Sequence, residues 1–233
     1  AFADEDILSY TVSSSTWAMY FDGSDVGITT DVDAFAMLTD GSILMSFDTT
    51  TTAGAAGSVA DADIVRFVPT STGSTTAGTF SLYFDGSDVG LTTTNEDIDA
   101  VELLADGRIV VSTLGTFSVT GASGDDKDLI AFTPTSLGST TSGTWSFYFD
   151  GSDVSLTTTN EDINGLGIAT NGHIYLSTVG TFSVTGVSGD GADIFRCVPG
   201  TLGSTTTCTY SMYWDGSVNG FAGEVTDGFH ISQ

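Results

Sequence analysis

The chain has 233 residues, 40% of them hydrophobic, which is enough to bury one sizeable core. Its 30 Asp and Glu residues against 4 Lys and Arg residues give a formal charge of −26, which argues against nucleic acid and anionic membranes as partners. The chain has no run of about 18 apolar residues, so we expect no membrane insertion.

The N-terminal sequence, AFADEDILSY, looks like the start of a mature secreted chain whose leader has been removed. It contains the first of two short segments, residues 6–12 and 16–21, in which apolar and polar side chains alternate. Alternation with a period of two predicts strands that pack one face against a core.

A motif at the end of the second segment, YFDGSDVGI, recurs three times, as YFDGSDVGL, YFDGSDVSL and YWDGSVNG. Its first aspartate is found at Asp22, Asp85, Asp150 and Asp215, at spacings of 63, 65 and 65 residues. Two further markers recur between the copies: a turn sequence (TDGS, ADGR, TNGH, TDGF) and an acidic run that leads into apolar residues. Self-similarity of this kind indicates a repeat architecture.

One repeat predicts four antiparallel strands, which we name a to d in chain order. In the second full repeat, strand a covers residues 98–104 and strand b covers residues 108–113, joined by Asp106 and Gly107, a pair that tolerates the positive φ of a tight hairpin. Strand c covers residues 128–134, and strand d covers residues 144–149 after a loop rich in Ser, Thr and Gly.

Strand d alternates strictly, which predicts that its large side chains face a core. In this repeat the inward residues are Trp145, Phe147 and Phe149, and Ser146 and Tyr148 point the other way. The matching inward residues of the other copies are Trp17, Met19 and Phe21; Phe80, Leu82 and Phe84; and Tyr210, Met212 and Trp214.

The two ends of the chain predict the architecture. The chain starts with strands c and d, and residues 220–233 supply strands a and b around an Asp227-Gly228 turn. We therefore expect one all-β domain, residues 1–233, folded as a four-bladed β-propeller. Its pieces are residues 1–25 (strands c and d of a split blade), whole blades at 31–88, 95–153 and 160–217, and residues 220–233.

Two matters stay open at this point. The alternatives to a propeller are an open array of β-sheet modules and a sandwich. The split blade is completed either within the chain or by a neighbouring subunit, and head-to-tail completion between subunits would give a fibre.

The pattern TTNEDIDAVELLADGRIVVST…FSVTG…DLIAFTPTS…GTWSFYFDGSDV resembles repeats of large, mostly uncharacterised secreted bacterial proteins. The resemblance covers nearly the whole chain and implies an extracellular or cell-surface β-repeat protein without a known enzymatic activity. The last repeat departs from the pattern, because it reads DGSVNG and lacks the TTTNED loop.

Acidic side chains gather in the loops that join strand b to strand c and strand d to the next strand a, and these loops share one face of a blade. Close carboxylates repel each other unless a cation or a proton intervenes, and calcium prefers such oxygen ligands. The sequence therefore predicts structural Ca²⁺, with these candidate ligands: Asp25, Asp88, Glu96, Asp97, Asp125, Asp126, Asp128, Asp153, Glu161, Asp162, Asp190 and Asp193.

The competing interpretation is purely structural: the DGS aspartates make Asx turns and the glycines take positive φ. The two interpretations overlap, since DGS can form the turn while the second Asp binds the ion. The weakened last copy, YWDGSVNG, predicts that the split blade is the one without the cation site. Asp33, Asp99 and Asn164 open strand a, and they either surround a channel cation or bond to local backbone, the second being favoured.

Cys197 on strand c and Cys208 on strand d bracket one hairpin loop, which predicts a disulfide and an oxidising compartment. The loops between strands c and d are rich in Ser and Thr. They are either sites of O-glycosylation or, as we favour, simply exposed loops.

The repetition of the acidic residues distinguishes between classes of function. An enzyme needs one asymmetric set of groups, whereas here similar carboxylates recur in every unit, so we expect no enzyme. The favoured hypothesis is an extracellular structural protein that self-associates into a fibre, filament or coat. The alternative is a calcium-dependent lectin or adhesin with glycans as partners.

Overall fold

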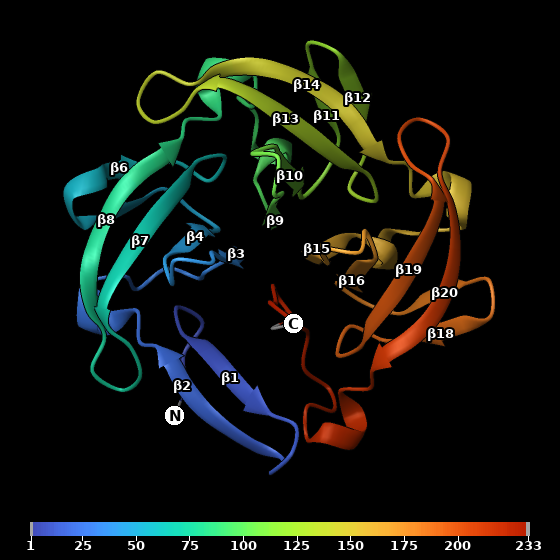
Figure 1. Cartoon of the computed structure of the whole chain (residues 1–233), viewed down its shortest axis with the longest axis horizontal. Coiled ribbons are helices and arrows are strands. Elements are labelled where there is room, and N and C mark those ends of the chain that lie inside the picture. Colours follow the sequence, from blue (N-terminus) through green and yellow to red (C-terminus); the bar gives the residue numbers. More distant parts are fainter. Residues whose placement is uncertain (1, 232–233) are drawn as a thin grey trace.

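The computed structural model describes residues 2–231, and these form strands and short 3₁₀ helices only. The all-β prediction is therefore confirmed. The chain forms several small antiparallel sheets, of which three have four strands each. Figure 1 shows these three sheets and a two-stranded hairpin arranged around a common centre.

Each four-stranded sheet is one repeat, and we call them units 1, 2 and 3. Unit 1 has the order β3-β4-β7-β8, unit 2 the order β9-β10-β13-β14, and unit 3 the order β15-β16-β19-β20. The strands are β3 (Ala34–Met37), β4 (Ile43–Ser46), β7 (Ile64–Ser71), β8 (Ala77–Phe84), β9 (Ala100–Leu103), β10 (Ile109–Ser112), β13 (Leu129–Ser136), β14 (Ser142–Phe149), β15 (Ile163–Ile168), β16 (Ile174–Thr178), β19 (Ile194–Thr201) and β20 (Thr207–Trp214).

The four strands of each unit are those expected from the sequence. Strands a and b of unit 2 are joined at Gly107, whose φ of 87° is the left-handed conformation that a tight turn requires. In Figure 1 strands β3, β9 and β15 lie nearest the centre, and β8, β14 and β20 lie outermost.

Small hairpins between strands b and c were not predicted. They are β5 (Thr51–Ala53) with β6 (Gly57–Val59), β11 (Phe117–Val119) with β12 (Ala122–Gly124), and β17 (Phe182–Val184) with β18 (Val187–Gly189). Their strands have three residues each, too short for a convincing period in the sequence.

The N-terminal hairpin packs against the residues that follow unit 3. The N-terminal hairpin consists of β1 (Ile7–Thr11) and β2 (Thr16–Phe21), which are the expected strands c and d. It contacts the region after β20 through a hydrogen bond from Tyr10 Oη to Asn219 Oδ1, at 2.9 Å. Trp17 also stacks on Phe221, with ring centroids 5.5 Å apart.

The prediction that residues 220–233 form strands a and b around a turn at Asp227-Gly228 is wrong. Residues 221–231, which we call the C-terminal segment, contain no strand, and the expected second strand ends at Ser232, which together with Gln233 lies outside the described residues. Thr226 N donates to Gly191 O at 2.7 Å, as Ile98 N donates to Asp61 O and Ile163 N to Asp126 O. Thr226 and Asp227 therefore occupy the start of strand a, and Asp227-Gly228 is not the turn between strands a and b.

Aromatic side chains of strand d are buried where the next unit covers them. Phe21, Phe84 and Phe149 have no exposed surface, and Trp145 is 6% exposed. Phe84 packs edge-to-face on Phe132, with centroids 5.2 Å apart. The last copy differs from the prediction, because Met212 is 37% exposed.

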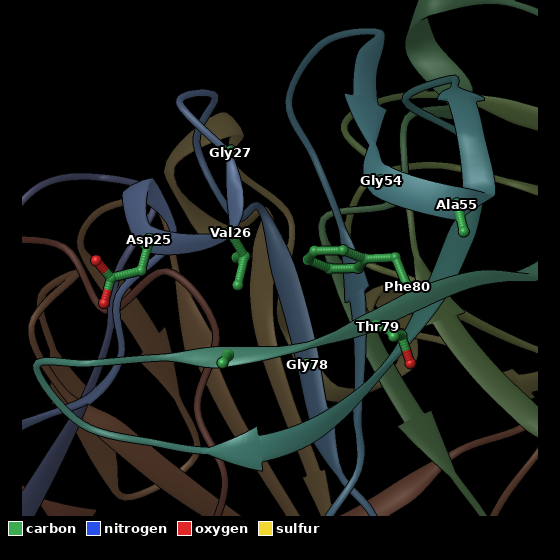
Figure 2. A pocket seen from close by; sticks show the side chains of 9 residues that line it. Asp25, Val26, Gly27, Gly54, Ala55, Gly78, Thr79 and Phe80 are labelled. Carbon is green, nitrogen blue, oxygen red and sulfur yellow. The ribbon is translucent and has the colours of Figure 1, made fainter.

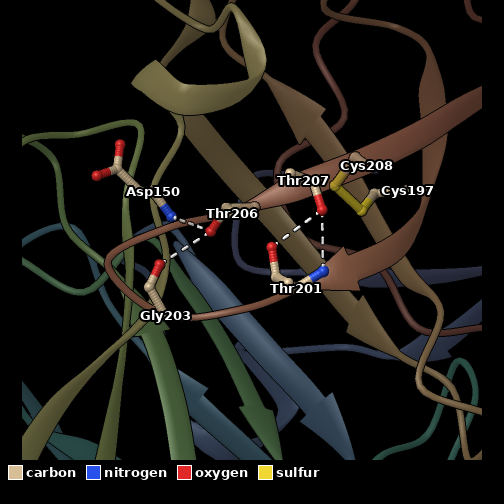
Figure 3. The surroundings of a disulfide bond; sticks show 7 residues. All are labelled: Asp150, Cys197, Thr201, Gly203, Thr206, Thr207 and Cys208. Atoms are coloured by element: carbon tan, nitrogen blue, oxygen red, sulfur yellow. Dashed lines mark hydrogen bonds between the residues drawn. A yellow bond between two sulfur atoms is a disulfide. The ribbon is translucent and has the colours of Figure 1, made fainter.

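The predicted disulfide between Cys197 and Cys208 is present, with a Cα–Cα distance of 5.3 Å (Figure 3). The matching pair in unit 2 is Phe132 and Gly143, where a Cβ on Gly143 would lie 2.5 Å from the Phe132 ring. The disulfide of unit 3 thus fills the space that a phenylalanine ring over a glycine fills elsewhere.

Short 3₁₀ helices connect the strands. They are η1 (Ser24–Val26), η2 (Gly54–Ala56), η3 (Ser87–Val89), η4 (Thr94–Glu96), η5 (Ser152–Val154), η6 (Thr159–Glu161) and η7 (Ser217–Asn219). No helix in the described part of the chain is long and apolar enough to cross a membrane.

Candidate functional site

The first aspartate of each DGS motif forms a local turn. Ser87 Oγ donates to Asp85 Oδ1 at 2.7 Å, and the corresponding serines bond to Asp22, Asp150 and Asp215. The turn leads into a one-turn 3₁₀ helix that ends at a left-handed residue, Gly90 with φ 100° in unit 1. The Asx-turn interpretation holds for this part of the motif.

The second aspartate of the motif reaches into the next unit. Asp88 Oδ2 accepts the backbone N–H of Thr141, whose hydroxyl accepts the N–H of Asp85 and donates to the carbonyl of Gly138. We call this set of bonds the inter-unit clamp. Asp25 with Thr76 and Asp153 with Thr206 repeat it at the same distance of 2.8 Å.

The clamp accounts for three of the predicted calcium ligands, Asp25, Asp88 and Asp153. It also changes the view of the Ser/Thr loops, because Thr76, Thr141 and Thr206 are only 2–4% exposed and their hydroxyls are bonded. Figure 3 shows the bonds of Thr206 with Asp150 and Gly203. These three threonines are therefore not exposed loop residues, as we had expected of the loops.

The aspartate that precedes strand c is held by two backbone donors. Asp128 Oδ1 accepts the N–H of Gly151 and Oδ2 accepts the N–H of Asp125, both at 3.0 Å. Asp193 makes the same pair of bonds with Gly216 and Asp190. Burial raises the pKa of Asp128 to about 6, against the lowering effect of these bonds. Both predicted ligands thus join the start of strand c to the turn that follows strand d in their own unit.

Glu96 and Glu161 are buried and fully bonded. Glu96 Oε2 accepts the N–H groups of Thr92 and Thr93 and the Thr93 hydroxyl, and Oε1 accepts the N–H of Ser118 in the β11 hairpin. Glu161 repeats this arrangement in unit 3. Burial would raise the pKa of Glu96, but the bonds lower it overall.

The remaining predicted ligands lie where consecutive units meet near the centre. Asp97 and Asp162 are 5% and 6% exposed, and the Oδ1 atom of each is buried without a hydrogen bond. Burial and neighbouring carboxylates raise the pKa of Asp97 to about 7 and that of Asp162 to about 8. Asp190, by contrast, accepts the backbone N–H of Ala192.

Asp125 and Asp126 have a cationic partner of their own. The Lys127 ammonium forms ion pairs with both, at 3.5 Å from Asp125 Oδ1, and the Lys127 residue is only 9% exposed. Lys127 was not singled out from the sequence. The cation beside Asp125 and Asp126 is therefore the Lys127 side chain.

The residues that open strand a lie around the centre of the molecule. Asn164 Nδ2 donates to Asp227 Oδ1 at 3.3 Å, so the C-terminal segment contributes a fourth member to this group. Both Asp99 side-chain oxygens are buried and make no hydrogen bond within normal distance and angle limits. Burial, together with the charges of Asp162 and Asp33, raises the pKa of this carboxyl well above its ordinary value, against the lowering effect of Ser112 and of the Asp99 backbone N–H. The favoured expectation of bonds to local backbone stays a prediction for Asp99.

These acidic groups do not form a finished metal site. Among residues 2–231, no three or more Asp, Glu, His or Cys side chains are already placed to hold a metal ion together. The structure divides the twelve predicted ligands into those bonded to backbone N–H groups and a smaller set at the junctions between units. Asp48, Asp61 and Asp227 were not among the residues predicted from the sequence. Which other carboxylates they lie near depends on how the units pack.

Two shallow grooves accompany these loops. One, of about 370 Å³, lies between the DGS turn after β2 and unit 1, and is lined by Asp25, Val26, Gly54 and Phe80 among others (Figure 2). The other, of about 350 Å³, is lined by Asp61, Asp63, Asp85 and a run of threonines. Both are open, and their carboxylates Asp25 and Asp63 already accept backbone N–H groups.

Comparison with known proteins identifies no family for this chain. No protein-family model matches the sequence, and no curated protein matches it significantly. A solved structure with partial similarity is the extracellular domain of a one-component system protein from B. thetaiotaomicron, at 11% identity and a TM-score of 0.22. The match covers 97% of this chain and 36% of the other, and at this TM-score no argument rests on it.

Proposed function

We propose that the protein is a non-enzymatic, extracellular structural subunit that self-associates into a filament or coat and is stabilised by Ca²⁺. In this proposal the fold is a four-bladed β-propeller. Units 1 to 3 are three blades, and the N-terminal hairpin and the C-terminal segment belong to the fourth.

The observation that carries the proposal is the open edge of β1. Within the described residues β1 pairs with β2 alone, whereas the matching strands β7, β13 and β19 each pair on both sides. An unpaired strand edge presents a row of backbone donors and acceptors to another strand. A strand from a second copy is the partner that this edge suits best.

Three further features support the proposal. The repeated carboxylates bond to backbone groups in unit after unit, which is how a scaffold uses them, and they do not form one asymmetric catalytic set. The disulfide fits an oxidising, extracellular setting. The acidic surface also needs cations to screen its self-repulsion.

The test is the oligomeric state of the purified, disulfide-bonded chain, measured by light scattering and electron microscopy at increasing concentration with Ca²⁺. We expect ordered assemblies. A peptide with the sequence of residues 41–48, which contains the strand that pairs with β7 in unit 1, should cap the β1 edge and inhibit assembly, and a scrambled peptide should not. Monomers at every concentration, together with calcium-dependent binding to a glycan array, would instead favour the lectin.

A further inference from the structure

The edge of β1 that faces away from β2 leaves two side chains less buried than their counterparts in units 1 to 3. Leu8 and Tyr10 are only partly buried. The pairing of strands c and d aligns them with residues that have no exposed surface, which are Val65, Ile130 and Phe195 for Leu8, and Phe67, Phe132 and Cys197 for Tyr10. In those units strand b lies along the same edge. A strand beside β1 would therefore bury apolar surface and pair an open edge.

The C-terminal segment is the part of a folded copy that can pair as a strand without opening a sheet. The b strands β4, β10 and β16 are each already paired on both sides, whereas the segment pairs with no strand among the described residues. Backbone hydrogen bonds hold its start, from Thr226 N to Gly191 O at 2.7 Å and from Gly228 N to Asn164 O at 3.0 Å.

The chain that leads to residues 226–231 is open to solvent. Residues 222–224 are exposed, and Val225 is 44% exposed. A Cβ on Gly223 would meet no atom within 4 Å. A change in this connection can therefore release residues 226–231, provided that Phe229, which is 8% exposed, is buried again elsewhere.

The sequence of the segment fits strand b in one register. The b strands read ILMS, IVVS and IYLS, and the segment continues as FHIS. Aligned on the serine, the segment matches unit 1 in three pairs, Phe229 with Ile43, His230 with Leu44 and Ile231 with Met45. The places that Phe229 and Ile231 would take are fully buried in unit 1.

This register covers the two exposed side chains of β1. In unit 1 the residues matched by Phe229 and Ile231 pair with the counterparts of Tyr10 and Leu8. Phe229 would therefore lie opposite Tyr10, and Ile231 opposite Leu8. Cross-strand pairs of aromatic and aliphatic side chains stabilise a sheet.

The direction of strand b favours a second copy as the donor. Strand b runs antiparallel to strand a, whereas the segment enters its own molecule where strands a start. To lie beside β1 of its own molecule the segment would have to reverse, while that of a second copy can approach in the required direction. The sequence of β1, ILSYT, has no charged residue, so this contact brings no two carboxylates together in a chain of charge −26.

We propose that residues 228–231 of a second copy pair with β1 as strand b, so that copies join head to tail. Donor and acceptor are different parts of the chain, so the contact is heterologous and continues from copy to copy. This inference rests on the proposed self-association and names its donor and its acceptor.

Two full-length variants separate the donor from the acceptor. His230→Pro with Ile231→Pro disables the donor, because successive N–H groups of a strand point to alternate sides and proline has none. Leu8→Lys disables the acceptor, because its ammonium would be buried under the incoming strand. Val12→Lys is the matched control, since Val12 is 77% exposed in the turn of the same hairpin.

Light scattering at a concentration at which the wild type assembles gives the result. Each disabled variant alone should stay monomeric, and Val12→Lys should assemble like the wild type. An equimolar mixture of the two disabled variants should form particles of twice the monomer mass and no larger, because one working donor meets one working acceptor. Circular dichroism checks that each variant is folded.

A cross-link tests the register without these variants. Leu8→Cys with Ile231→Cys, oxidised after assembly, should give a ladder of linked copies on a non-reducing gel. Leu8→Cys with His230→Cys places the two thiols on opposite faces of the sheet and should link far less.

Three results would overturn the inference. Assembly of both disabled variants on their own would leave self-association in place at another surface. A cross-link within single copies would show that the segment completes its own molecule. A wild type that stays monomeric at every concentration would remove the proposed self-association as well.

Discussion

Asp88 of unit 1 accepts the backbone N–H of Thr141 of unit 2 at 2.8 Å, across a separation of 53 residues in the chain. Tyr83 O, one residue before Phe84, accepts the N–H of Gly138 in the same loop at 2.7 Å. One motif, YFDGSD, thus supplies both the end of a strand and the contact that joins it to the next unit.

Removing the clamp carboxylate should destabilise the protein. In Asp88→Ala the buried N–H of Thr141 loses its charged acceptor, at a cost of about 1–3 kcal/mol. Urea unfolding followed by circular dichroism measures the change. Val218 holds the same position in the last copy, is 76% exposed and makes no such bond, so Val218→Ala is the control and should be neutral. Equal stability of the two variants would contradict the role given to Asp88.

Replacing Asp128, the aspartate before strand c, with asparagine should destabilise the protein. Both Asp128 oxygens accept backbone N–H groups, and in Asp128→Asn one N–H of the protein would face an NH₂ group. We expect a loss of about 1–3 kcal/mol. Asp106→Asn, in an exposed turn, is the control. A melting temperature within one degree of the wild type for Asp128→Asn would sink this interpretation.

Glu96 should make the protein sensitive to acid. Its bonds lower the folded-state pKa below the ordinary 4.5, so its stabilisation is complete above pH 4.5 and is lost as the pH falls through the lower folded value. Glu96→Gln should therefore be less stable than the wild type at pH 7, and the difference should shrink on acidification. Stability curves between pH 7 and pH 3 measure it. A constant difference would show that Glu96 acts through shape alone.

The contribution of Glu102 to stability should depend on pH in the opposite sense to that of Glu96. Burial raises its pKa to about 7, although Ile168 N and Leu103 N donate to it. The folded state therefore holds this proton more tightly, and the contribution of Glu102 to stability falls as the pH rises from 4.5 through about 7. Glu102→Gln loses one acceptor for these N–H groups, but its stability relative to the wild type should rise as the pH increases from 4 to 8, measured by melting temperature at each pH. A difference that stays constant over this range would refute the role of the Glu102 proton.

The disulfide should be replaceable by the packing of the other units. Reducing Cys197–Cys208 or changing both to Ala should cost about 2–3 kcal/mol. The double variant Cys197→Phe and Cys208→Gly copies Phe132 and Gly143 of unit 2 and should recover much of this, with no dependence on reductant. Melting with and without dithiothreitol measures both. If the copy is no better than the alanine pair, the two solutions are not equivalent.

Local patterns in the sequence were sufficient for the strands of the three four-stranded sheets, for the N-terminal hairpin and for the disulfide. The alternation of Trp145, Phe147 and Phe149 predicted β14, and the positive φ at Gly107 followed from the Asp-Gly pair. The hairpin β11–β12 was not predicted, because three-residue strands have no measurable period. Asp227 was misplaced because an Asp-Gly pair also fits the start of strand a, as Asn164-Gly165 does in unit 3.

The sequence by itself determined a four-fold acidic repeat of short strands, because strand period, turn chemistry and cysteine spacing act over a few residues. Only the tertiary structure decided what the acids do. Asp88, Asp128 and Glu96 bond to backbone groups 53, 23 and 22 residues away. The pKa of Asp97 is raised by burial and by the charges of Asp61 and Asp48, which belong to another unit. The strands follow from local conformational preference, whereas the partner of a carboxylate depends on which unit folds against which.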